Sequence, residues 1–475
     1  MPDKAGGCSL PWFAERAGAR LYNYSEGAAV AAFERVETDS RAVGPGALFV
    51  ALRGERADGH DYLAQVQAAG AAAALVSEAW YASAGEAACL RLPLVVAPDP
   101  LAALQRAAAA WRASLPGIAR IGITGSSGKT TVKEMCAAIL SRVMRTVKNP
   151  GNLNSEIGLP ASIFLMRPEH ELAVFELGIN RQGEMDILAE IFAPDCALIT
   201  GIGTAHIGLL GGSRLGIASE KKRIASRFTG VQTLIVREDD EFKDFLMSDL
   251  AGRALGYGPR SMPLFEGARG LGLAGWSLRY GGLECRLALP GAHNLMNALA
   301  AIRAAELYGA GPEAVRDGLA ELAALSGRSQ VLPGPVTIVN DSYNANAESA
   351  VAALEFCDEA EHAGRRVYVL GSMKELGDHG PEAHRLVGRR AARSKAAAVF
   401  FFGQEAQDGY RAAAEAIAEA GAGPAIYHFV DYGELEAAVV AALRPGDAAL
   451  LKASRSMALE RLIEPIRKIG GGDAS

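Results

Sequence analysis

A glycine-rich turn at residues 125–131, Gly-Ser-Ser-Gly-Lys-Thr-Thr, contains the residue types that bind phosphate groups. Its two glycines let backbone N–H groups close around anionic oxygens, and Lys129 adds a mobile positive charge. An apolar run at 118–123 precedes the turn, and a helix expected at 132–143 adds the positive end of its dipole. The hydroxyl of Thr130 suits a magnesium ion on the same phosphates. The segment therefore predicts nucleotide binding rather than a coincidental loop.

The turn departs from the general phosphate-loop pattern, which places a glycine five residues before the second glycine. That position is Ile123. A shorter pattern, GxxGKTT, is present instead, and Gly125 makes the turn. The short form narrows the set of nucleotide-binding families to which the chain can belong.

Two further side chains are expected near the phosphate loop, at the carboxyl edge of a sheet. Glu176 lies in the strand candidate at 172–177, and a charge inside so apolar a run is costly unless something compensates it. His206 follows the strand candidate at 197–200 through a loop of small residues. We expect Glu176 to bind magnesium and His206 to contact a second metal or a phosphate. A solvated glutamate and an ordinary loop histidine are the alternatives.

Positive charges gather at two other places. Residues 221–223 carry three in a row, which indicates either a solvated helix face or a phosphate contact. Lys452, Ser454 and Arg455 follow the last strand candidate, on the edge where open α/β sheets bind ligands. Two cations and a hydroxyl suit an anion such as a substrate carboxylate.

Arg328 lies just before a turn at 340–346 that is rich in asparagine and aspartate. Such a density of these residues can reflect capping and turn chemistry alone. An arginine between two domains is also well placed to reach a nucleotide across a cleft.

The elements that must position these residues divide the chain into three segments, 1–108, 109–330 and 331–475, and its length suits about three domains. The first has short strand-like runs at 47–52 and 94–97. The second alternates strands and helices as in a mostly parallel sheet, and the third resembles a Rossmann-like open sheet without a dinucleotide fingerprint. The fold class is therefore α/β. Further strands are expected at 233–236, 336–339, 367–370, 398–402, 426–429 and 448–451, and helices at 294–308, 381–393 and 404–420.

Bulk properties exclude several classes of protein. Half of the 475 residues are apolar, 21% are charged and the net charge is −6, so neither a disordered chain nor a nucleic-acid-binding surface is indicated. The six cysteines form no Cys-x-x-Cys pair, which argues against zinc sites and a disulfide framework. No apolar run approaches the roughly 20 residues of a membrane helix, and the N-terminus leads into no signal core. A cytoplasmic enzyme is expected.

Several motifs, in order along the chain, together resemble those of the Mur ligase family. They are GSSGKTT (125–131), NPGNLNSEIGLP (149–160), FELG (175–178), the loop ending at His206, GAHNLMNALAA (291–301), NDSYNANAES (340–349), GSMKELG (371–377) and LLKASRSM (450–457). The N-terminal TDSR (38–41) with PGALFVALRGERADGHD (45–61) resembles the uridine-nucleotide domain of the members that add a dipeptide. The resemblance spans essentially the whole chain, and the number of motifs makes it specific.

The resemblance implies an N-terminal UDP-substrate-binding domain, a central ATP-binding domain and a C-terminal Rossmann-like domain for the incoming dipeptide. It implies catalytic roles for Lys129, Glu176, His206 and Lys221, and magnesium ligation by Thr130, Glu176, His206 and Lys221. The implied ATP-binding residues are Gly125, Ser126, Ser127, Gly128, Lys129, Thr130, Thr131, His293, Asn294, Asn297, Arg328 and Asp341. The implied substrate-binding residues are Ser40, Arg41, Asn152, Asn154, Asn344, Asn346, Lys452, Ser454 and Arg455.

In this family a lysine after the histidine loop is carbamylated and binds the metal. The segment IASEKKRIA resembles that region and assigns the role to Lys221, with Lys222 as the fallback. An ammonium beside magnesium would repel it, whereas a carbamate formed from the neutral amine and carbon dioxide is an anion that can bind it.

The implied activity is ATP-dependent amide formation in peptidoglycan precursor synthesis. D-alanyl-D-alanine would join a UDP-N-acetylmuramoyl tripeptide, with lysine or diaminopimelate as third residue, through an acyl phosphate, releasing ADP and phosphate. A monomer without nucleic-acid partner or membrane insertion is expected. Two alternatives within the ligase class are the enzymes that add the third stem residue and the folate polyglutamate synthetases; the YNAN turn and the TDSR segment disfavour both. An alternative from another class is a regulatory P-loop ATPase. That function would leave residues 452–455 without a role. An inactive paralogue would not be expected to retain the catalytic set.

Three positions depart from the family pattern. Ser155 stands where asparagine is common, Ala347 where proline is common and Ala453 where glycine is common. The methyl group of Ala453 could restrict approach of the backbone to the dipeptide. None of these changes removes a charged or metal-binding group, so activity is expected.

Overall fold

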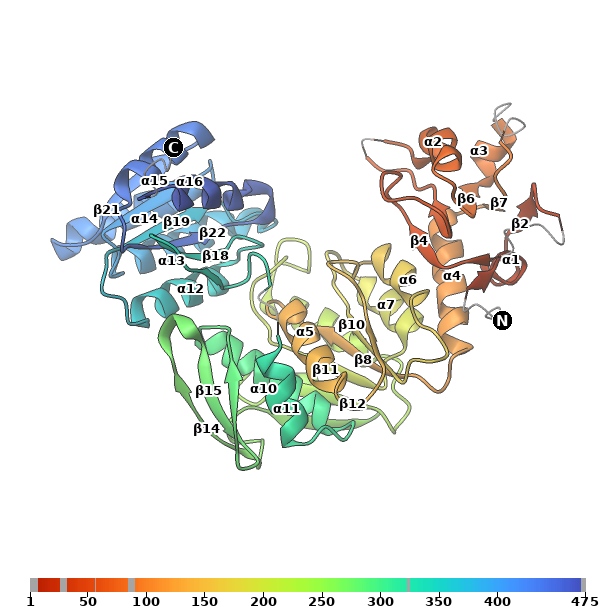
Figure 1. The fold of residues 1–475 in the computed structure, drawn as a ribbon, viewed down its shortest axis with the longest axis horizontal. Helices are drawn as coiled ribbons and strands as arrows, with labels where there is room; N and C mark the ends of the chain where they lie inside the picture. The colour runs from red at the N-terminus through yellow and green to blue at the C-terminus, as the bar shows by residue number, and fades with distance from the viewer. Residues whose placement is uncertain (1–6, 26–31, 56, 84–89, 323–324, 471–475) are drawn as a thin grey trace.

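The computed structural model describes residues 7–25, 32–55, 57–83, 90–322 and 325–470. Its α/β architecture has three lobes arranged in an arc, coloured red to orange, orange through yellow to green, and teal to blue in chain order (Figure 1). Each lobe is built on its own sheet of five or six strands. In the described part of the chain, no helix is both long and apolar enough to cross a bilayer.

The N-terminal lobe has a five-stranded sheet in the order β2-β7-β6-β5-β4, in which only β2 pairs antiparallel. Its elements, with the short β1 and β3 beside them, are β1 (Cys8–Ser9), α1 (Leu10–Ala17), β2 (Arg20–Tyr22), β3 (Ala32–Phe33), β4 (Arg35–Glu37), β5 (Ala47–Val50), α2 (Leu63–Ala68), β6 (Ala73–Ser77), α3 (Glu78–Ser83) and β7 (Leu94–Ala97). Asp99 caps the next helix, α4 (Pro100–Ala113). Trp111 of α4 packs against Phe164 in the central lobe, so this helix joins the two lobes.

The central lobe has a six-stranded sheet in the order β13-β12-β11-β8-β10-β9, and all its strand pairs are parallel. The strands are β8 (Ala119–Thr124), β9 (Thr146–Lys148), β10 (Leu172–Glu176), β11 (Cys196–Ile199), β12 (Thr233–Arg237) and β13 (Arg253–Tyr257). The helices are α5 (Lys129–Leu140), α6 (Gly158–Ile163), α7 (Glu184–Phe192), α8 (Arg214–Lys222), α9 (Lys243–Met247), α10 (Ala292–Glu306) and α11 (Pro312–Ala320). Helices α5 and α10 share one apolar core with the sheet, and α6 and α7 share another. Burial on both faces explains the continuous apolar runs from which the strands were predicted.

A small antiparallel sheet, absent from the sequence-based prediction, follows β13. It consists of β14 (Phe265–Gly270), β15 (Trp276–Tyr280) and β16 (Leu283–Leu287). The turn between β14 and β15 carries Leu273, which packs against the core of the C-terminal lobe. This sheet therefore supports that lobe from the central one.

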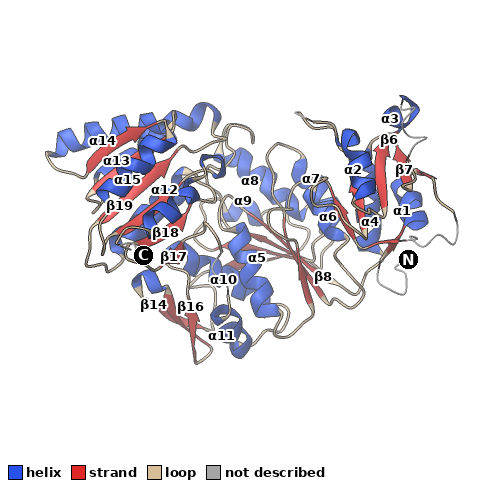
Figure 2. Ribbon diagram, turned by 45° about the horizontal axis from the view of Figure 1, so that its top comes forward, coloured by secondary structure: helices blue, strands red, loops and turns tan. Residues whose placement is uncertain are grey.

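The C-terminal lobe has a six-stranded sheet in the order β17-β18-β22-β19-β20-β21, parallel except for β17. The strands are β17 (Gln330–Leu332), β18 (Thr337–Asp341), β19 (Arg366–Gly371), β20 (Ala398–Phe402), β21 (Ala425–Phe429) and β22 (Ala448–Lys452). Helices α12 (Ala347–Glu359), α13 (Gly380–Ala392) and α14 (Ala406–Ala420) cover one face, and α15 (Tyr432–Ala442) and α16 (Ile463–Arg467) cover the other. Figure 2 shows α12, α13 and α14 packed along the strands of this sheet. The Rossmann-like alternation predicted for this segment is confirmed.

Candidate active site

The glycine-rich turn lies between β8 and α5, and both of its glycines are required by the packing. Gly125 has a φ of 147° and Gly128 a φ of 84°. A Cβ atom on Gly125 would lie 1.9 Å from Thr200 Oγ1, and one on Gly128 would lie 2.4 Å from Asn297 Oδ1. Helix α5 begins at Lys129, earlier than predicted, so its free N–H groups face the turn. This cradle fits a phosphate chain.

Lys129 folds back over the turn. Its Nζ donates a hydrogen bond of 2.9 Å to the carbonyl of Gly125. Burial lowers the pKa of Lys129, Glu176 opposes that shift, and the charge of Arg328 adds to it. The ammonium is therefore held at the turn, close to another positive charge. An anionic phosphate bound there would reduce the repulsion between these charges.

Glu176 lies at the carboxyl end of β10 and is only 2% exposed. Its carboxylate accepts hydrogen bonds of 2.6 Å from Thr130 Oγ1 and of 2.6 Å from Asn154 Nδ2. Asn149 fixes its backbone, because Asn149 Oδ1 accepts from the N–H of Glu176 at 2.9 Å. A hydroxyl and a carboxylate at this distance form a hard oxygen pair that fits magnesium. No cluster of three or more His, Cys, Asp or Glu side chains able to share a metal occurs in the described ranges.

Lys221 and Lys222 differ sharply in their surroundings. Lys221, in the last turn of α8, is 1% exposed, and burial together with the charge of Lys129 lowers its pKa well below the ordinary lysine value. Lys222 instead donates to the carbonyl of Phe245 at 2.8 Å and to Ser248 Oγ at 2.9 Å. Lys222 is thus engaged in packing α8 onto α9, whereas Lys221 lies near Lys129 and Glu176.

His206 contacts the C-terminal lobe. Its Nδ1 lies 3.0 Å from Oε2 of Glu375, in the loop after β19, and this close contact with His206 holds the pKa of that carboxyl below its usual value. In the same loop as His206, the Thr204 hydroxyl donates to Glu348 Oε2 at 2.8 Å. The structure thus joins Thr130 to Glu176 directly, while the contact of His206 is with Glu375.

Two predicted residues reach the phosphate loop from beyond the central sheet. Arg328 donates to Thr130 Oγ1 at 2.9 Å, and its guanidinium lies 4.0 Å from the ring centroid of Tyr343. Asn346, which also caps α12, donates through Nδ2 to Ser127 Oγ at 3.0 Å. The C-terminal lobe therefore contacts the phosphate loop directly.

Asp341 and Lys452 form an ion pair of 2.7 Å at adjoining strand ends of the C-terminal sheet. Lys452 also donates to the carbonyl of Asn344 at 2.9 Å. Asp341 Oδ1 accepts from the N–H of Ser329, whose hydroxyl lies 3.2 Å from His293 Nε2. Several predicted residues thus form one polar network at the lobe boundary.

The asparagines of α10 hold the start of that helix. Asn294 donates to the carbonyl of Pro290 at 2.7 Å, and Asn297 Nδ2 donates to Asn294 Oδ1 at 3.1 Å. Asn297 also lies against Gly128 of the phosphate loop. These contacts tie α10 to the loop.

Other predicted substrate-binding residues lie in more exposed or locally bonded places. Arg41 pairs with Asp39 at 2.6 Å, and its side chain is 84% exposed. Asn152 is exposed and Ser40 half-buried. Arg455 pairs with Glu460 at 2.8 Å. The structure does not bring Ser40 and Arg41 into contact with the phosphate loop.

Ser454 and Ala453 have roles inside the C-terminal lobe. Ser454 Oγ accepts from the N–H of Lys374 at 2.9 Å. The side chain of Ala453 is fully buried, and a Cβ on Gly371 would lie 2.6 Å from it. Ala347 is also buried, at the start of α12. The methyl group of Ala453 thus packs in the core rather than facing outward.

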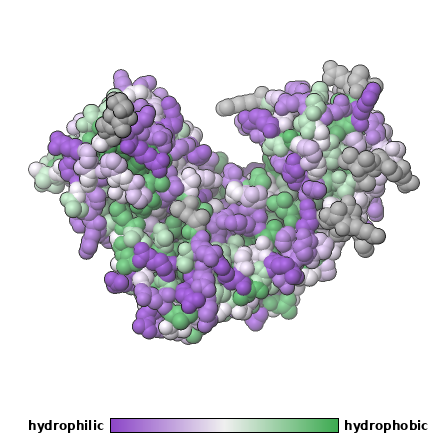
Figure 3. Space-filling view, viewed as in Figure 1, coloured by the Kyte–Doolittle hydropathy of each residue, from purple (hydrophilic) through white to green (hydrophobic). Residues whose placement is uncertain are grey.

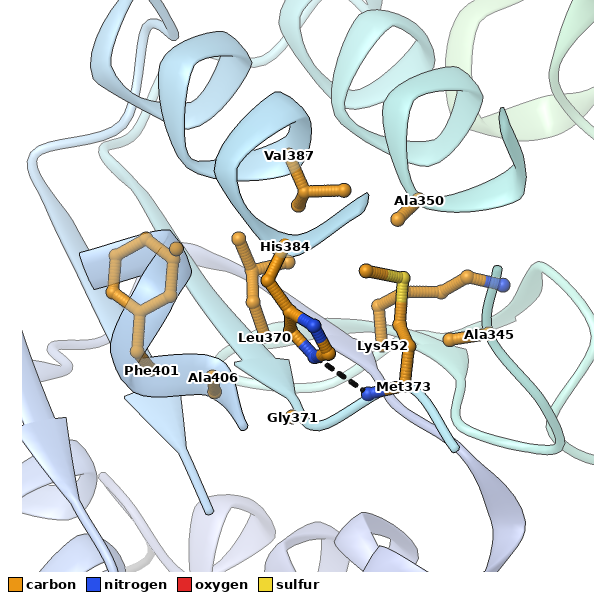
Figure 4. Close-up of a pocket in the computed structure, with 11 residues that line it drawn as sticks. Ala345, Ala350, Leu370, Gly371, Met373, His384, Val387, Phe401, Ala406 and Lys452 are labelled. Carbon is orange, nitrogen blue, oxygen red and sulfur yellow. Dashed lines mark hydrogen bonds between the residues drawn. The ribbon is translucent and has the colours of Figure 1, made fainter. Parts of the chain in front are cut away.

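Sequence reasoning missed several residues that shape the site. Lys133, fully buried, donates to the carbonyl of Asn149 at 2.7 Å and so fixes the turn beside Glu176. His384 lines a pocket of the C-terminal lobe with Lys452 (Figure 4). Tyr343 could have been found from its place in the YNAN turn, whereas nothing local marks Lys133 as different from a surface lysine.

The space-filling view shows the molecule hollowed between the N-terminal and C-terminal lobes, above the central lobe (Figure 3). Purple, hydrophilic residues line much of this face. The hollow leaves room for a large polar substrate.

Comparison with known proteins gives matches along most of the chain. Residues 32–112 match the model of the Mur ligase family catalytic domain, 123–305 that of the Mur ligase middle domain, and 327–455 that of the Mur ligase glutamate ligase domain. The chain is 43% identical over 450 residues to the UDP-N-acetylmuramoyl-tripeptide–D-alanyl-D-alanine ligase of Treponema pallidum (strain Nichols), covering 92% of this chain and 94% of that protein.

Solved structures agree with the family models. MurF from Acinetobacter baumannii matches with a TM-score of 0.85 and 29% identity, covering 98% of this chain and 100% of that one. MurF from Thermotoga maritima, solved in complex with ADP, matches with a TM-score of 0.73 and 25% identity, covering 92% and 97%. The chain therefore belongs to the Mur ligase family.

Proposed function

We propose that the protein is an ATP-dependent ligase that joins D-alanyl-D-alanine to a UDP-N-acetylmuramoyl tripeptide in peptidoglycan precursor synthesis. The observation that carries this proposal is the phosphate loop contacted by Arg328 and by Asn346 of the C-terminal lobe. A relative named for this reaction is 43% identical and aligned over 94% of its length. The arrangement brings a phosphate site and a third lobe together, as a reaction with three ligands requires.

The chemistry explains why a phosphate site serves amide formation. A carboxylate is a poor electrophile and hydroxide a poor leaving group, so carboxylate and amine do not condense readily in water. An oxygen of the peptide carboxylate attacks the γ-phosphorus of ATP, the bond to the β-phosphate oxygen breaks, and ADP leaves. The dipeptide amine then attacks the acyl carbon, loses a proton to solvent, and phosphate departs with one oxygen of the former carboxylate.

The residues of the phosphate site have separate tasks in this scheme. Lys129 neutralises charge on the transferred phosphoryl group, and the N–H groups of the turn and of α5 hold the phosphate chain. Thr130, Glu176 and His206 would hold magnesium, which when bound offsets the negative charge of the phosphates. Arg328, which contacts Thr130 and Tyr343, would bind the same phosphates.

Lys221 is proposed to act as a carbamate. A buried amine with a lowered pKa spends more time neutral, and only the neutral amine reacts with carbon dioxide. Carbamylation replaces a costly buried cation beside Lys129 by an anion that the same positive charges and magnesium stabilise. Lys222 remains the fallback, although its ammonium already bonds to the carbonyl of Phe245.

The remaining predicted residues keep their proposed roles. His293, Asn294, Asn297 and Asp341 serve the nucleotide; Ser40, Arg41, Asn152 and Asn154 serve the UDP-sugar peptide; and Asn344, Asn346, Lys452, Ser454 and Arg455 serve the reactants in the C-terminal lobe. Binding of the dipeptide carboxylate by Lys452 requires that it share or release Asp341. A cytoplasmic location and a monomeric state remain predictions.

The proposal is tested by measuring phosphate release from ATP with lysine- and diaminopimelate-containing UDP-muramoyl tripeptides, with and without D-alanyl-D-alanine. Release that requires both the tripeptide and the dipeptide is expected, and the preferred tripeptide identifies the third residue. Release that ignores the dipeptide would contradict a ligase. Acceptance of a single amino acid by a UDP-muramoyl dipeptide would favour the ligases that add the third stem residue.

A further inference from the structure

The loop between β19 and α13 touches the central lobe at His206. Oε2 of Glu375 lies 3.0 Å from His206 Nδ1. Both residues have positive φ angles, 65° for Glu375 and 61° for His206, which residues other than glycine adopt only when their surroundings enforce it. The backbones meet beside this pair, because a Cβ on Gly208 would lie 3.1 Å from Gly377 Cα. The two loops therefore meet in a defined geometry.

The C-terminal lobe fixes the backbone of this loop just before Glu375. His384 Nε2 accepts a hydrogen bond of 2.9 Å from the N–H of Met373 (Figure 4). Ser454 Oγ accepts one of 2.9 Å from the N–H of Lys374. The side chain of Glu375 is nevertheless 58% exposed. The lobe thus uses buried polar groups to present an exposed carboxylate to the neighbouring lobe.

The pair has a recognisable chemical consequence. A carboxylate beside one ring nitrogen of a histidine keeps a proton on that nitrogen and leaves the lone pair of the other nitrogen free for a ligand. Among the residues that the structure describes, buried Nδ1 of His206 has no aligned hydrogen-bond partner, although Glu375 is at contact distance. A rotation of the imidazole ring would align this contact as a hydrogen bond.

We infer that Glu375 is a positioning residue for His206: the carboxylate that the C-terminal lobe presents fixes the imidazole with Nε2 free to bind the metal. The inference rests on the proposed ligase function and deepens it, because it links the contact between the two lobes to completion of the phosphate site. Glu348 supplies a matched control. It makes a carboxylate contact of 2.8 Å to Thr204 in the same loop but none with His206.

The first test measures Mn²⁺ binding in the presence of ADP by electron paramagnetic resonance. Glu375→Ala is expected to weaken Mn²⁺ binding roughly tenfold. Glu375→Gln is expected to lose less, since its amide oxygen still accepts from Nδ1–H, and Glu348→Gln is expected to leave binding unchanged. Equal losses in Glu375→Ala and Glu348→Gln would overturn the proposal, because they would indicate lobe contact alone, and so would full affinity in Glu375→Ala.

The second test reads the imidazole itself. The chain has eight histidines, so ¹⁵N labelling of histidine gives a tractable spectrum, and a His206→Gln variant assigns the resonance. With ADP and no metal at alkaline pH, Nδ1 is expected to carry the proton in the wild type, and Nε2, as in free neutral histidine, in Glu375→Ala. The same tautomer in both proteins would refute positioning by Glu375.

The outcomes separate this inference from the proposed function. A wild-type protein that binds Mn²⁺ with the expected dependence on Glu375 but forms no amide would refute the ligase function alone. A wild-type protein that forms the amide, combined with unaltered Mn²⁺ binding in Glu375→Ala, would refute the inference alone.

Discussion

The phosphate loop and the N-terminal turn at 38–41 are both expected to bind anionic parts of substrates, but the structure holds them differently. At the phosphate loop, Thr130 is contacted by Glu176 and by Arg328 from another part of the chain. In the N-terminal turn, Arg41 is 84% exposed and pairs with Asp39, two residues away. Side chains that are already ordered lose less conformational entropy on binding. The comparison indicates that the phosphate loop is preorganised, whereas the proposed UDP contacts are expected to become ordered only with the substrate.

The largest effect is expected from Lys129→Ala, which removes the cation of the preorganised site. We expect kcat to fall by about 100- to 1000-fold, because charge developing on the phosphoryl group loses a fixed partner. The rate of dipeptide-dependent phosphate release measures this change in kcat. The control is Lys148→Ala, which removes a lysine that pairs with Glu134 outside the loop and is expected to leave kcat unchanged. Comparable losses in the two variants would contradict the special role of Lys129.

The next largest effect is expected from Lys221→Ala, because it removes the proposed carbamate. We expect a loss of activity smaller than that of Lys129→Ala, which acetate or formate partly restores, since a small carboxylate can occupy the space and supply the anion. Lys222→Ala is the matched control. We expect it to lower the stability of the protein, and we expect added carboxylate not to change its activity. Full activity of Lys221→Ala without added carboxylate would refute the carbamate assignment. Rescue confined to Lys222→Ala would move the assignment to Lys222.

A moderate effect is expected from Arg328→Lys. Lysine keeps the charge but loses the planar group that stacks on Tyr343 while bonding to Thr130. One charged hydrogen bond is worth about 1.5 kcal/mol or more, so kcat should fall about tenfold. Arg316→Lys, in an exposed pair with Asp317, is expected to change nothing. A wild-type rate in Arg328→Lys would show that charge alone is needed.

A smaller and different effect is expected from Arg41→Ala in the exposed turn. The apparent KM for the UDP substrate should rise a few-fold to about tenfold while kcat stays near the wild-type value, since only ground-state binding is lost. Steady-state kinetics with varied UDP-tripeptide measures this. A large fall in kcat with unchanged KM would contradict the proposed difference between the phosphate loop and the turn at 38–41.

The smallest effect concerns the dependence of stability on pH. Burial lowers the pKa of His384 and of His293. As the pH falls, these histidines bind protons in the unfolded chain before they do so in the folded protein. Their contribution to stability is therefore complete above about pH 6.5 and is lost as the pH falls below it. Each group adds at most about 1.4 kcal/mol per pH unit to that slope. Urea unfolding between pH 5 and pH 8 tests this, and His384→Gln should flatten the slope; an unchanged slope would contradict it.

Much of the fold is readable from local sequence because burial on both faces of a parallel sheet leaves uninterrupted apolar runs. The strands β7 and β20 lie where their runs predict, and Gly125 and Gly128 mark the phosphate loop. The sheet of β14 to β16 was missed because its strands are partly exposed and rich in glycine and charge. Their pattern lacks the apolar continuity of the other strands.

The sequence allowed many residues of the candidate site to be identified, but not the contacts between them. Glu176 could be identified because a charge in an apolar strand needs compensation. The contact of His206 with Glu375 could not, because the two residues are far apart in the sequence and are joined only by the packing of two lobes. The burial of Lys133 beside Asn149 is likewise a tertiary property.

The most direct measurement follows an oxygen atom through the reaction. The UDP-tripeptide is labelled with ¹⁸O in the carboxylate that becomes the amide, and the phosphate released with ATP and D-alanyl-D-alanine is analysed by mass spectrometry. Activation of the carboxylate at the phosphate loop predicts one ¹⁸O atom in each phosphate, because the acyl oxygen leaves with it. Phosphate that carries no ¹⁸O while the amide forms would contradict phosphoryl transfer to the carboxylate and with it the account of Lys129.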